Sequence, residues 1–110
     1  MADEATIERF RAMTVRFPDS ELPWFSLGRA LHEARQFAEA AVAFDAACAR
    51  RPDMMMAWLH AAECLAADRR WSEARERASE AHRLAVGQGH SGPQADATAL
   101  IEEVDDELDA

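Results

Sequence analysis

Two side chains with metal-binding chemistry lie one helical turn apart, at His60 and Cys64. An imidazole and a thiolate can both bind zinc, but a zinc site needs four protein ligands, or three together with a water. The remaining histidines are scattered along the chain, at His32, His82 and His90, and none supplies a third ligand beside this pair. We therefore expect no metal site.

The sequence also lacks the patterns that accompany catalysis. It has no Gly-rich phosphate loop, no nucleophile elbow, and no pair of carboxylates set among apolar residues. Its two cysteines, Cys48 and Cys64, are too few for a disulfide framework, so we expect packed thiols. The sequence predicts a protein that is not an enzyme and that has no cofactor.

The net charge of -9 is concentrated near the end of the chain. Seven of the 21 acidic residues lie between positions 95 and 110, where there is no basic residue. This balance argues against nucleic-acid binding, which depends on basic side chains. No apolar run is long enough for membrane insertion, and the first residues, Met1 to Glu4, do not resemble a secretory signal. We expect a cytoplasmic protein, and the use of Arg without any Lys suggests a bacterial one.

Small and aromatic residues recur along the chain at an interval of 34. The matching pairs are Trp24 and Trp58, Gly28 and Ala62, Ala40 and Ala74, and Ala47 and Ala81. Around these positions, apolar residues follow the three- and four-residue spacing of amphipathic helices. Small residues at Gly28 and Ala40 indicate that two helix axes approach closely, with Trp24 and Phe44 filling the wider gaps. The repeated unit is therefore a pair of short antiparallel helices.

The run Trp24-x2-Leu27-Gly28-x2-Leu31, followed by Ala40-x3-Phe44-x2-Ala47 and Pro52, resembles a tetratricopeptide repeat in both period and residue order. The resemblance implies an all-α fold, a right-handed superhelical stack of antiparallel helix pairs with about six helices. We expect one domain over 1–110, consisting of a half repeat at 4–17, repeats at 21–54 and 55–88, a loop at 87–93, and a C-terminal capping helix at 94–109. The acidic last helix could cap the stack or fold over the groove toward Arg29.

In tetratricopeptide proteins the first helix of each repeat lines a concave groove, so the resemblance implies a set of partner-binding residues. These are Leu22, Phe25, Arg29, His32, Glu33, Met56, Leu59, His60 and Glu63. The alternative is that the apolar members, Leu22, Phe25, Met56 and Leu59, only pack against neighbouring helices.

The expected function is a protein-protein interaction module, an adaptor or scaffold that binds a peptide or helix of another protein in this groove. Relatives that clamp a terminal carboxylate use Lys, which this chain lacks, so we expect a partner with apolar anchors and some basic character. Two alternatives remain. The protein could self-associate as a homo-oligomer, or it could be a specialised chaperone for a secreted or assembling client.

Overall fold

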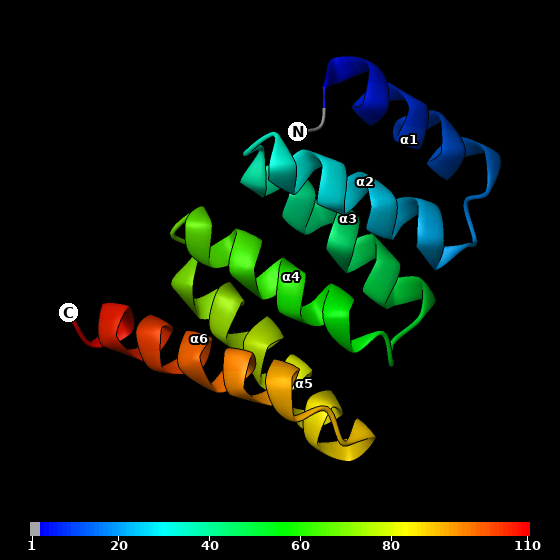
Figure 1. Ribbon diagram of the computed structural model, residues 1–110. Helices are drawn as coiled ribbons and strands as arrows, with labels where there is room; N and C mark the ends of the chain where they lie inside the picture. Colours follow the sequence, from blue (N-terminus) through cyan, green and yellow to red (C-terminus); the bar gives the residue numbers. More distant parts are fainter. Residues whose placement is uncertain (1–2) are drawn as a thin grey trace.

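The computed structural model describes residues 3–110, and over this range the chain forms six α-helices and no strand. The helices are α1 (Glu4–Arg16), α2 (Glu21–Glu33), α3 (Phe37–Arg50), α4 (Met55–Ala67), α5 (Trp71–Gln88) and α6 (Ser91–Asp109). Each packs beside the next in an elongated stack of 40 × 30 × 20 Å, with α1 at one end and α6 at the other (Figure 1). This confirms the predicted all-α stack of helix pairs.

The two tryptophans that reveal the repeat make the same contact in each unit. The indole Nε1 of Trp24 donates a hydrogen bond to the carbonyl of Pro18 at 3.4 Å, and that of Trp58 donates to the carbonyl of Pro52 at 2.8 Å. Each bond ties the first turns of one helix to the connection that precedes it. The 34-residue interval is therefore a repeated tertiary contact as well as a repeated residue type.

The turns inside the two repeats are also equivalent. Arg35 and Arg69, 34 residues apart, both adopt a φ of 60°, a left-handed conformation that is uncommon for residues other than glycine. In the first turn the backbone N–H of Gln36 donates to the carbonyl of Leu31 at 2.9 Å, and the matching bond closes the second turn. These bonds satisfy carbonyls that the ends of α2 and α4 would otherwise leave free.

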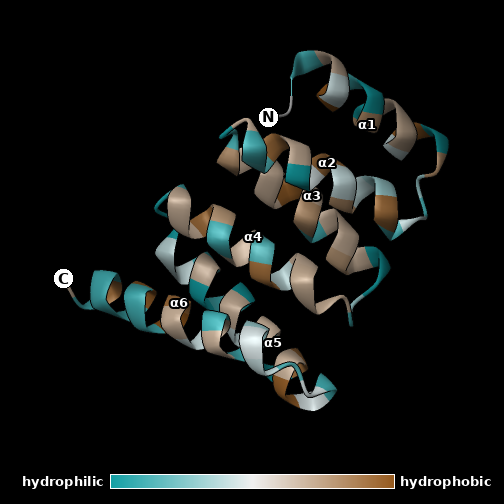
Figure 2. Cartoon of the chain, viewed as in Figure 1, coloured by the Kyte–Doolittle hydropathy of each residue, from teal (hydrophilic) through white to brown (hydrophobic). Residues whose placement is uncertain are grey.

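Alanine dominates the contacts between helices. Ala40, Ala61, Ala62 and Ala74 are fully buried, and one continuous core cluster extends from Ile7 to Val104. Figure 2 shows hydrophobic and hydrophilic residues alternating around each helix, with the last turns of α6 mostly hydrophilic. Small side chains at these crossings let short helices pack closely without large voids.

The C-terminal part differs from the sequence-based expectation. A loop over 87–93 was expected, but that prediction was wrong, because α5 continues to Gln88 and α6 already begins at Ser91. Gly89 makes the reversal alone with a φ of 73°, the conformation in which glycine commonly ends a helix. Pro93 lies in the first turn of α6, where a missing N–H leaves no intrahelical bond unmade.

Among residues 3–110, none of the helices combines the length and hydropathy that a membrane-spanning segment requires.

Candidate binding groove

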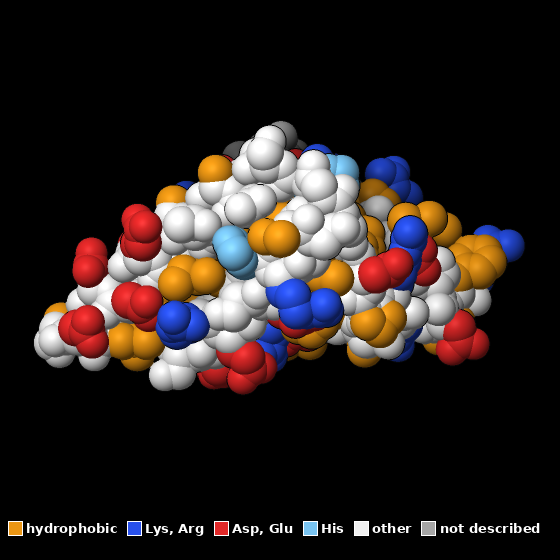
Figure 3. All heavy atoms as spheres, turned by 90° about the horizontal axis from the view of Figure 1, so that it is seen from below, with side chains coloured by type: hydrophobic (Ala, Val, Ile, Leu, Met, Phe, Trp, Pro, Cys, Tyr) orange, Lys and Arg blue, Asp and Glu red, His pale blue; other side chains and the backbone are white. Residues whose placement is uncertain are grey.

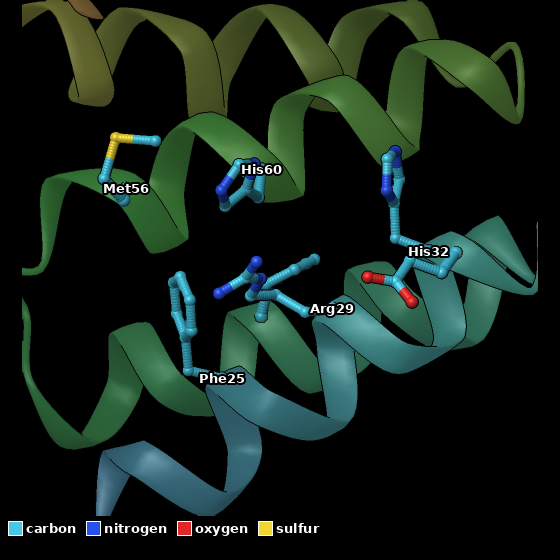
Figure 4. A pocket seen from close by; sticks show the side chains of 7 residues that line it. Phe25, Arg29, His32, Met56 and His60 are labelled. Carbon is cyan, nitrogen blue, oxygen red and sulfur yellow. The ribbon is translucent and has the colours of Figure 1, made fainter. Parts of the chain in front are cut away.

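A hollow of about 400 Å³ opens between α2 and α4. Its wall comes from both helices and from α3 behind them. The lining residues are Phe25, Arg29, His32 and Glu33 of α2, Phe44 of α3, and Met56 and His60 of α4. In Figure 4, Met56 and His60 lie on α4 across the hollow from Phe25, Arg29 and His32 on α2. Six of the nine predicted groove residues therefore line one hollow, and we call it the α2–α4 pocket.

Three rings form the aromatic part of the α2–α4 pocket: Phe25, Phe44 and His60. Phe44 is 1% exposed, and its ring centroid lies 5.5 Å from that of Phe25 in an edge-to-face arrangement. The imidazole of His60 lies 5.3 Å from Phe44 and 5.8 Å from Phe25. Edge-to-face aromatic pairs are mutually stabilising, so this cluster holds the pocket wall in a defined shape.

The position of Phe44 depends on Gly28. A Cβ atom built at Gly28 would lie 2.8 Å from two atoms of the Phe44 ring, closer than ordinary contact allows. In the second repeat, Ala62 stands where Gly28 would be and Ala78 stands where Phe44 would be, and both are buried. The first repeat therefore uses the smallest residue opposite a large ring, and the second uses two small residues.

The sequence assigned Phe44 only to packing between helices, so its place in the pocket was missed. A signal was present in the chain. Of the two equivalent positions, Phe44 and Ala78, only the first is large, and it lies opposite the only glycine in either repeat core. A large ring at only one of two equivalent positions is the signal that distinguishes the first repeat here.

The charged groups of the α2–α4 pocket are unequally partnered. The Nδ1 atom of His60 lies 3.1 Å from the Oε1 atom of Glu63, one turn further along α4. The ring of His32 packs edge-on against Phe37, with centroids 5.6 Å apart. Within residues 3–110, Arg29 has neither a hydrogen bond nor an ion pair from its side chain. Its guanidinium extends between Phe25 and His60 in Figure 4.

A second hollow, of about 370 Å³, lies between α4 and α6, and we call it the α4–α6 hollow. Its lining residues are Leu59, Glu63, Asp96, Ala99, Leu100 and Glu103. The sequence assigned none of the α6 residues to a groove. His60 lines the α2–α4 pocket, and it contacts Glu63, which lines the α4–α6 hollow. The two hollows therefore adjoin across α4.

Three of the predicted groove residues do not line the α2–α4 pocket: Glu63, which lines the α4–α6 hollow, and Leu22 and Leu59. Leu22 is 59% exposed and does not line the α2–α4 pocket. Leu59 is 3% exposed and packs with Ala81 and Ala97, so it belongs to the core, as the alternative interpretation of the apolar stripe held. It reaches the surface only at the floor of the α4–α6 hollow.

The helix α6 lies at the end of the described stack, opposite α1. It packs against α5 and α4, and its Ala97 and Val104 are fully buried there. An ion pair of 2.7 Å between Arg75 Nε and Asp105 Oδ1 fixes its C-terminal half to α5. The α2–α4 pocket is left open, so the arrangement in which α6 covers Arg29 is not the one observed.

Cys64 and His60, the two neighbouring side chains with metal-binding chemistry, lie on different faces of α4. Cys64 is buried in the core cluster, whereas His60 faces the α2–α4 pocket. In the part of the chain that the structure describes, no group of three or more His, Cys, Asp or Glu side chains could hold a metal ion. Burial raises the pKa of both Cys48 and Cys64 to about 12, so both thiols stay protonated and unreactive at neutral pH.

No protein-family model matches this chain, and no curated protein matches its sequence. The fold does match solved structures. One is the translocator chaperone SycD of type III secretion from Yersinia enterocolitica, with a TM-score of 0.86, 17% identity, and coverage of 94% of this chain and 72% of that one. SycD also matches as a complex with a peptide of the translocator YopD and as an alternative dimer.

Two further solved complexes are similar. PcrH bound to the chaperone-binding region of PopD has a TM-score of 0.86 at 20% identity, with 93% of this chain and 77% of that chain covered. The TPR2B domain of yeast Sti1, solved as a complex with pHsp70, has a TM-score of 0.82 at 17% identity, with 92% and 81% covered. The fold of this chain is therefore that of the tetratricopeptide repeat, a right-handed superhelical stack of helix pairs.

Proposed function

We propose that this protein is a non-catalytic interaction module that binds a peptide or helix of another protein in the groove formed by α2, α4 and α6. The α2–α4 pocket is the observation that carries this proposal. It offers an apolar wall of three rings, with Arg29 and His32 beside it. Pockets of this kind, apolar with a few polar groups, are typical binding sites.

The similar structures support the same function. PcrH, SycD and the TPR2B domain have each been solved with part of another protein, namely a region of PopD, a peptide of YopD and pHsp70. Two of the three are chaperones by name or by the segment they bind, so a chaperone for a secreted or assembling client is the specific form of the proposal that we favour. We place this function in the bacterial cytoplasm, a compartment in which two buried free thiols are stable.

Selection of peptides displayed on phage tests the proposal with the full chain as the target. We expect a pool of binding peptides whose affinity for the protein falls at least tenfold with Phe25→Asp, measured by fluorescence anisotropy. Because Phe25 also packs on Phe44, a second variant, Met56→Glu, changes the half-buried opposite wall. Val42→Asp is the matched control, since Val42 is an exposed apolar residue on α3 outside the pocket.

The interpretation depends on the folded state of each variant. Thermal unfolding should show that Met56→Glu and Val42→Asp are folded at the assay temperature. If both pocket variants bind the selected peptides as tightly as the wild type does, the groove is not the binding site and the proposal is wrong.

Self-association is a second candidate, favoured by the surface near the N-terminal end of the stack. Four apolar side chains around α1 and the start of α2 are exposed: Met13, Val15, Phe17 and Leu22. Among residues 3–110, α1 lies at the end of the stack and packs against α2 (Figure 1). Exposed apolar side chains can take part in an interface between protein chains.

Light scattering tests this second candidate. We expect a dimer whose mass falls to that of a monomer with Val15→Glu and Phe17→Glu, and no change with Val42→Glu. A wild-type protein that is monomeric at every concentration would remove this candidate and would leave the groove proposal untouched.

A further inference from the structure

The α2–α4 pocket contains one permanent cation, and within residues 3–110 that cation makes no ion pair. Of its seven lining residues only Arg29 is always charged positively, because guanidinium groups stay protonated in proteins. Among residues 3–110, six other arginines pair with carboxylates, as Arg77 does with Asp45 at 3.0 and 3.1 Å and Arg75 with Asp105, whereas five, including Arg69, make no ion pair. Within residues 3–110, no carboxylate oxygen lies within 4.0 Å of the Arg29 guanidinium.

The two acidic residues predicted for the groove, Glu33 and Glu63, make no ion pair with Arg29 in this arrangement. Glu63 lies on α4 and contacts the imidazole of His60. Glu33, one turn after Arg29, is the last residue of α2 and has no ion pair with it. Arg29 instead extends across the pocket toward α4, between Phe25 and His60 (Figure 4). Its donors therefore point into the space that a ligand would occupy.

The charge of the groove reverses on the other side of α4. The α4–α6 hollow is lined by Glu63, Asp96 and Glu103 and by no basic residue. Acidic side chains also gather toward the end of the molecule where α6 ends (Figure 3). A negatively charged group is repelled from this region, so in the described groove the position beside Arg29 is the favourable one for a carboxylate.

We propose that the segment bound in the groove carries an Asp or Glu directly beside an apolar anchor. The anchor contacts the Phe25, Phe44 and His60 rings, and Arg29 binds the neighbouring carboxylate. An arginine and a carboxylate can form two parallel hydrogen bonds, which gives this contact a strict geometry. The inference rests on the proposed function and adds to it the chemistry that the site selects.

This chemistry differs from the expectation drawn from the sequence, which favoured a partner with some basic character. That expectation placed Arg29, Glu33 and Glu63 together in one groove. In the structure Glu63 contacts His60 and lines the α4–α6 hollow, which leaves Arg29 and Glu33 as the charged residues of the α2–α4 pocket, and Arg29 extends across it toward α4. The acidic α4–α6 hollow then repels the carboxylate of the bound segment. This repulsion determines where along the groove that carboxylate can lie.

Peptide display with a charge reversal tests the inference. The full chain, its Arg29→Glu variant and a control variant, Arg69→Glu, are each used to select from one random peptide library. Arg69 is exposed in the turn before α5 and lines neither the α2–α4 pocket nor the α4–α6 hollow. Both variants change the net charge by the same amount, so an effect of total charge would appear in both pools.

We expect the wild-type and Arg69→Glu pools to be enriched in Asp or Glu next to Leu, Ile, Met or Phe. The Arg29→Glu pool should lose this enrichment and gain Lys or Arg at the same place, since charge complementarity controls partner choice. For one wild-type peptide, replacing its acidic residue by the matching amide should weaken binding roughly tenfold, and Arg29→Gln should abolish that difference.

The possible results separate the inference from the function beneath it. Peptides that need Phe25 and Met56 but show no acidic enrichment, or an unchanged preference with Arg29→Glu, would overturn the inference and keep the proposed function. Peptides that bind equally well to Phe25→Asp and Met56→Glu would overturn both. A wild-type chain that selects no peptide would also contradict both.

Discussion

Replacing Gly28 with alanine tests how tightly the first repeat is built around Phe44. The added Cβ would lie 2.8 Å from the ring, and Phe44 is buried, so the ring must move or the two helices must separate. Overpacking of this kind costs about 1–3 kcal/mol. Alanine in a helix interior gains up to about 1 kcal/mol over glycine. The net result should be a loss of about 1 kcal/mol in the free energy of unfolding.

A matched glycine elsewhere removes the helix-propensity contribution from the comparison. Gly87 is helical, near the end of α5, and a Cβ built there would meet no other atom within 4 Å. Gly87→Ala should therefore stabilise the protein slightly, whereas Gly28→Ala should destabilise it. The difference between the two variants, about 2 kcal/mol, isolates the clash with Phe44. In thermal unfolding this difference corresponds to roughly 8 °C for a domain of this size.

Without the Phe44 ring, Gly28→Ala should lower the free energy of unfolding by a smaller amount. The second repeat already combines Ala62 with Ala78, so Gly28→Ala should cost less in a Phe44→Leu background than in the wild type. The assay is urea unfolding of the two single variants and the double variant, analysed as a double-mutant cycle. If Gly28→Ala is as stable as Gly87→Ala, or if the two changes at positions 28 and 44 are simply additive, the close approach at Gly28 is not what positions Phe44.

Three further predictions concern an ion pair, the thiols and the cap. Asp45→Ala should lower the free energy of unfolding by about 1 kcal/mol, because it deprives the half-buried Arg77 of a two-bond partner joining α5 to α3. Glu80→Ala, which breaks an exposed pair within α5, should cost less than about 0.5 kcal/mol in the same urea assay, and equal costs would contradict this. Because burial raises the pKa of Cys48 and Cys64 to about 12, the unfolded chain releases these protons first, and stability should fall as the pH rises above about 9. Cys48→Ala with Cys64→Ala should flatten that decline in chemical unfolding at pH 8 to 10.5, and an unchanged slope would show that other groups cause it. Deleting residues 91–110 should expose Leu59 and Ala81, measured as dye binding to apolar surface and a lower melting temperature. A truncated protein that keeps its stability and binds selected peptides more tightly would instead identify α6 as an inhibitor of the groove.

The repeat architecture could be predicted from the sequence because its signals are local. The 34-residue interval from Trp24 to Trp58 corresponds to one repeated hydrogen bond, and the small residues at Gly28 and Ala40 mark close helix crossings. These features depend on the residue type and its spacing, both of which the chain displays. The helix pairs and their order followed directly.

The details that depend on neighbours outside the repeat could not be predicted. Leu59 has the same helical spacing as a groove residue, but in the structure it packs in the core with Ala81 of α5 and Ala97 of α6. The loop expected before α6 was wrong because one glycine, Gly89, is enough for the reversal. Glycine and proline at 92 and 93 indicated a loop by composition, yet both fit the first turn of a helix.

Part of the groove could be predicted and part could not. Phe25, Arg29 and His60 were identified by carrying the family's first-helix positions onto this chain, and they do line the α2–α4 pocket. Their partners were hidden, because the contact between His60 and Glu63 and the lack of one at Arg29 depend on side-chain directions. Spacing along a helix shows which residues share a face but not which of them pair.

Mapping of a bound peptide by NMR tests the central claim most directly. The tightest peptide from the wild-type selection would be titrated into the ¹⁵N-labelled full chain, and the backbone amide shifts followed. We predict that the largest shifts fall on α2 and α4 around Phe25, Arg29, Met56 and His60. Shifts confined instead to α1 or to the exposed side of α3 around Val42 would contradict the assignment of the α2–α4 pocket as the binding site.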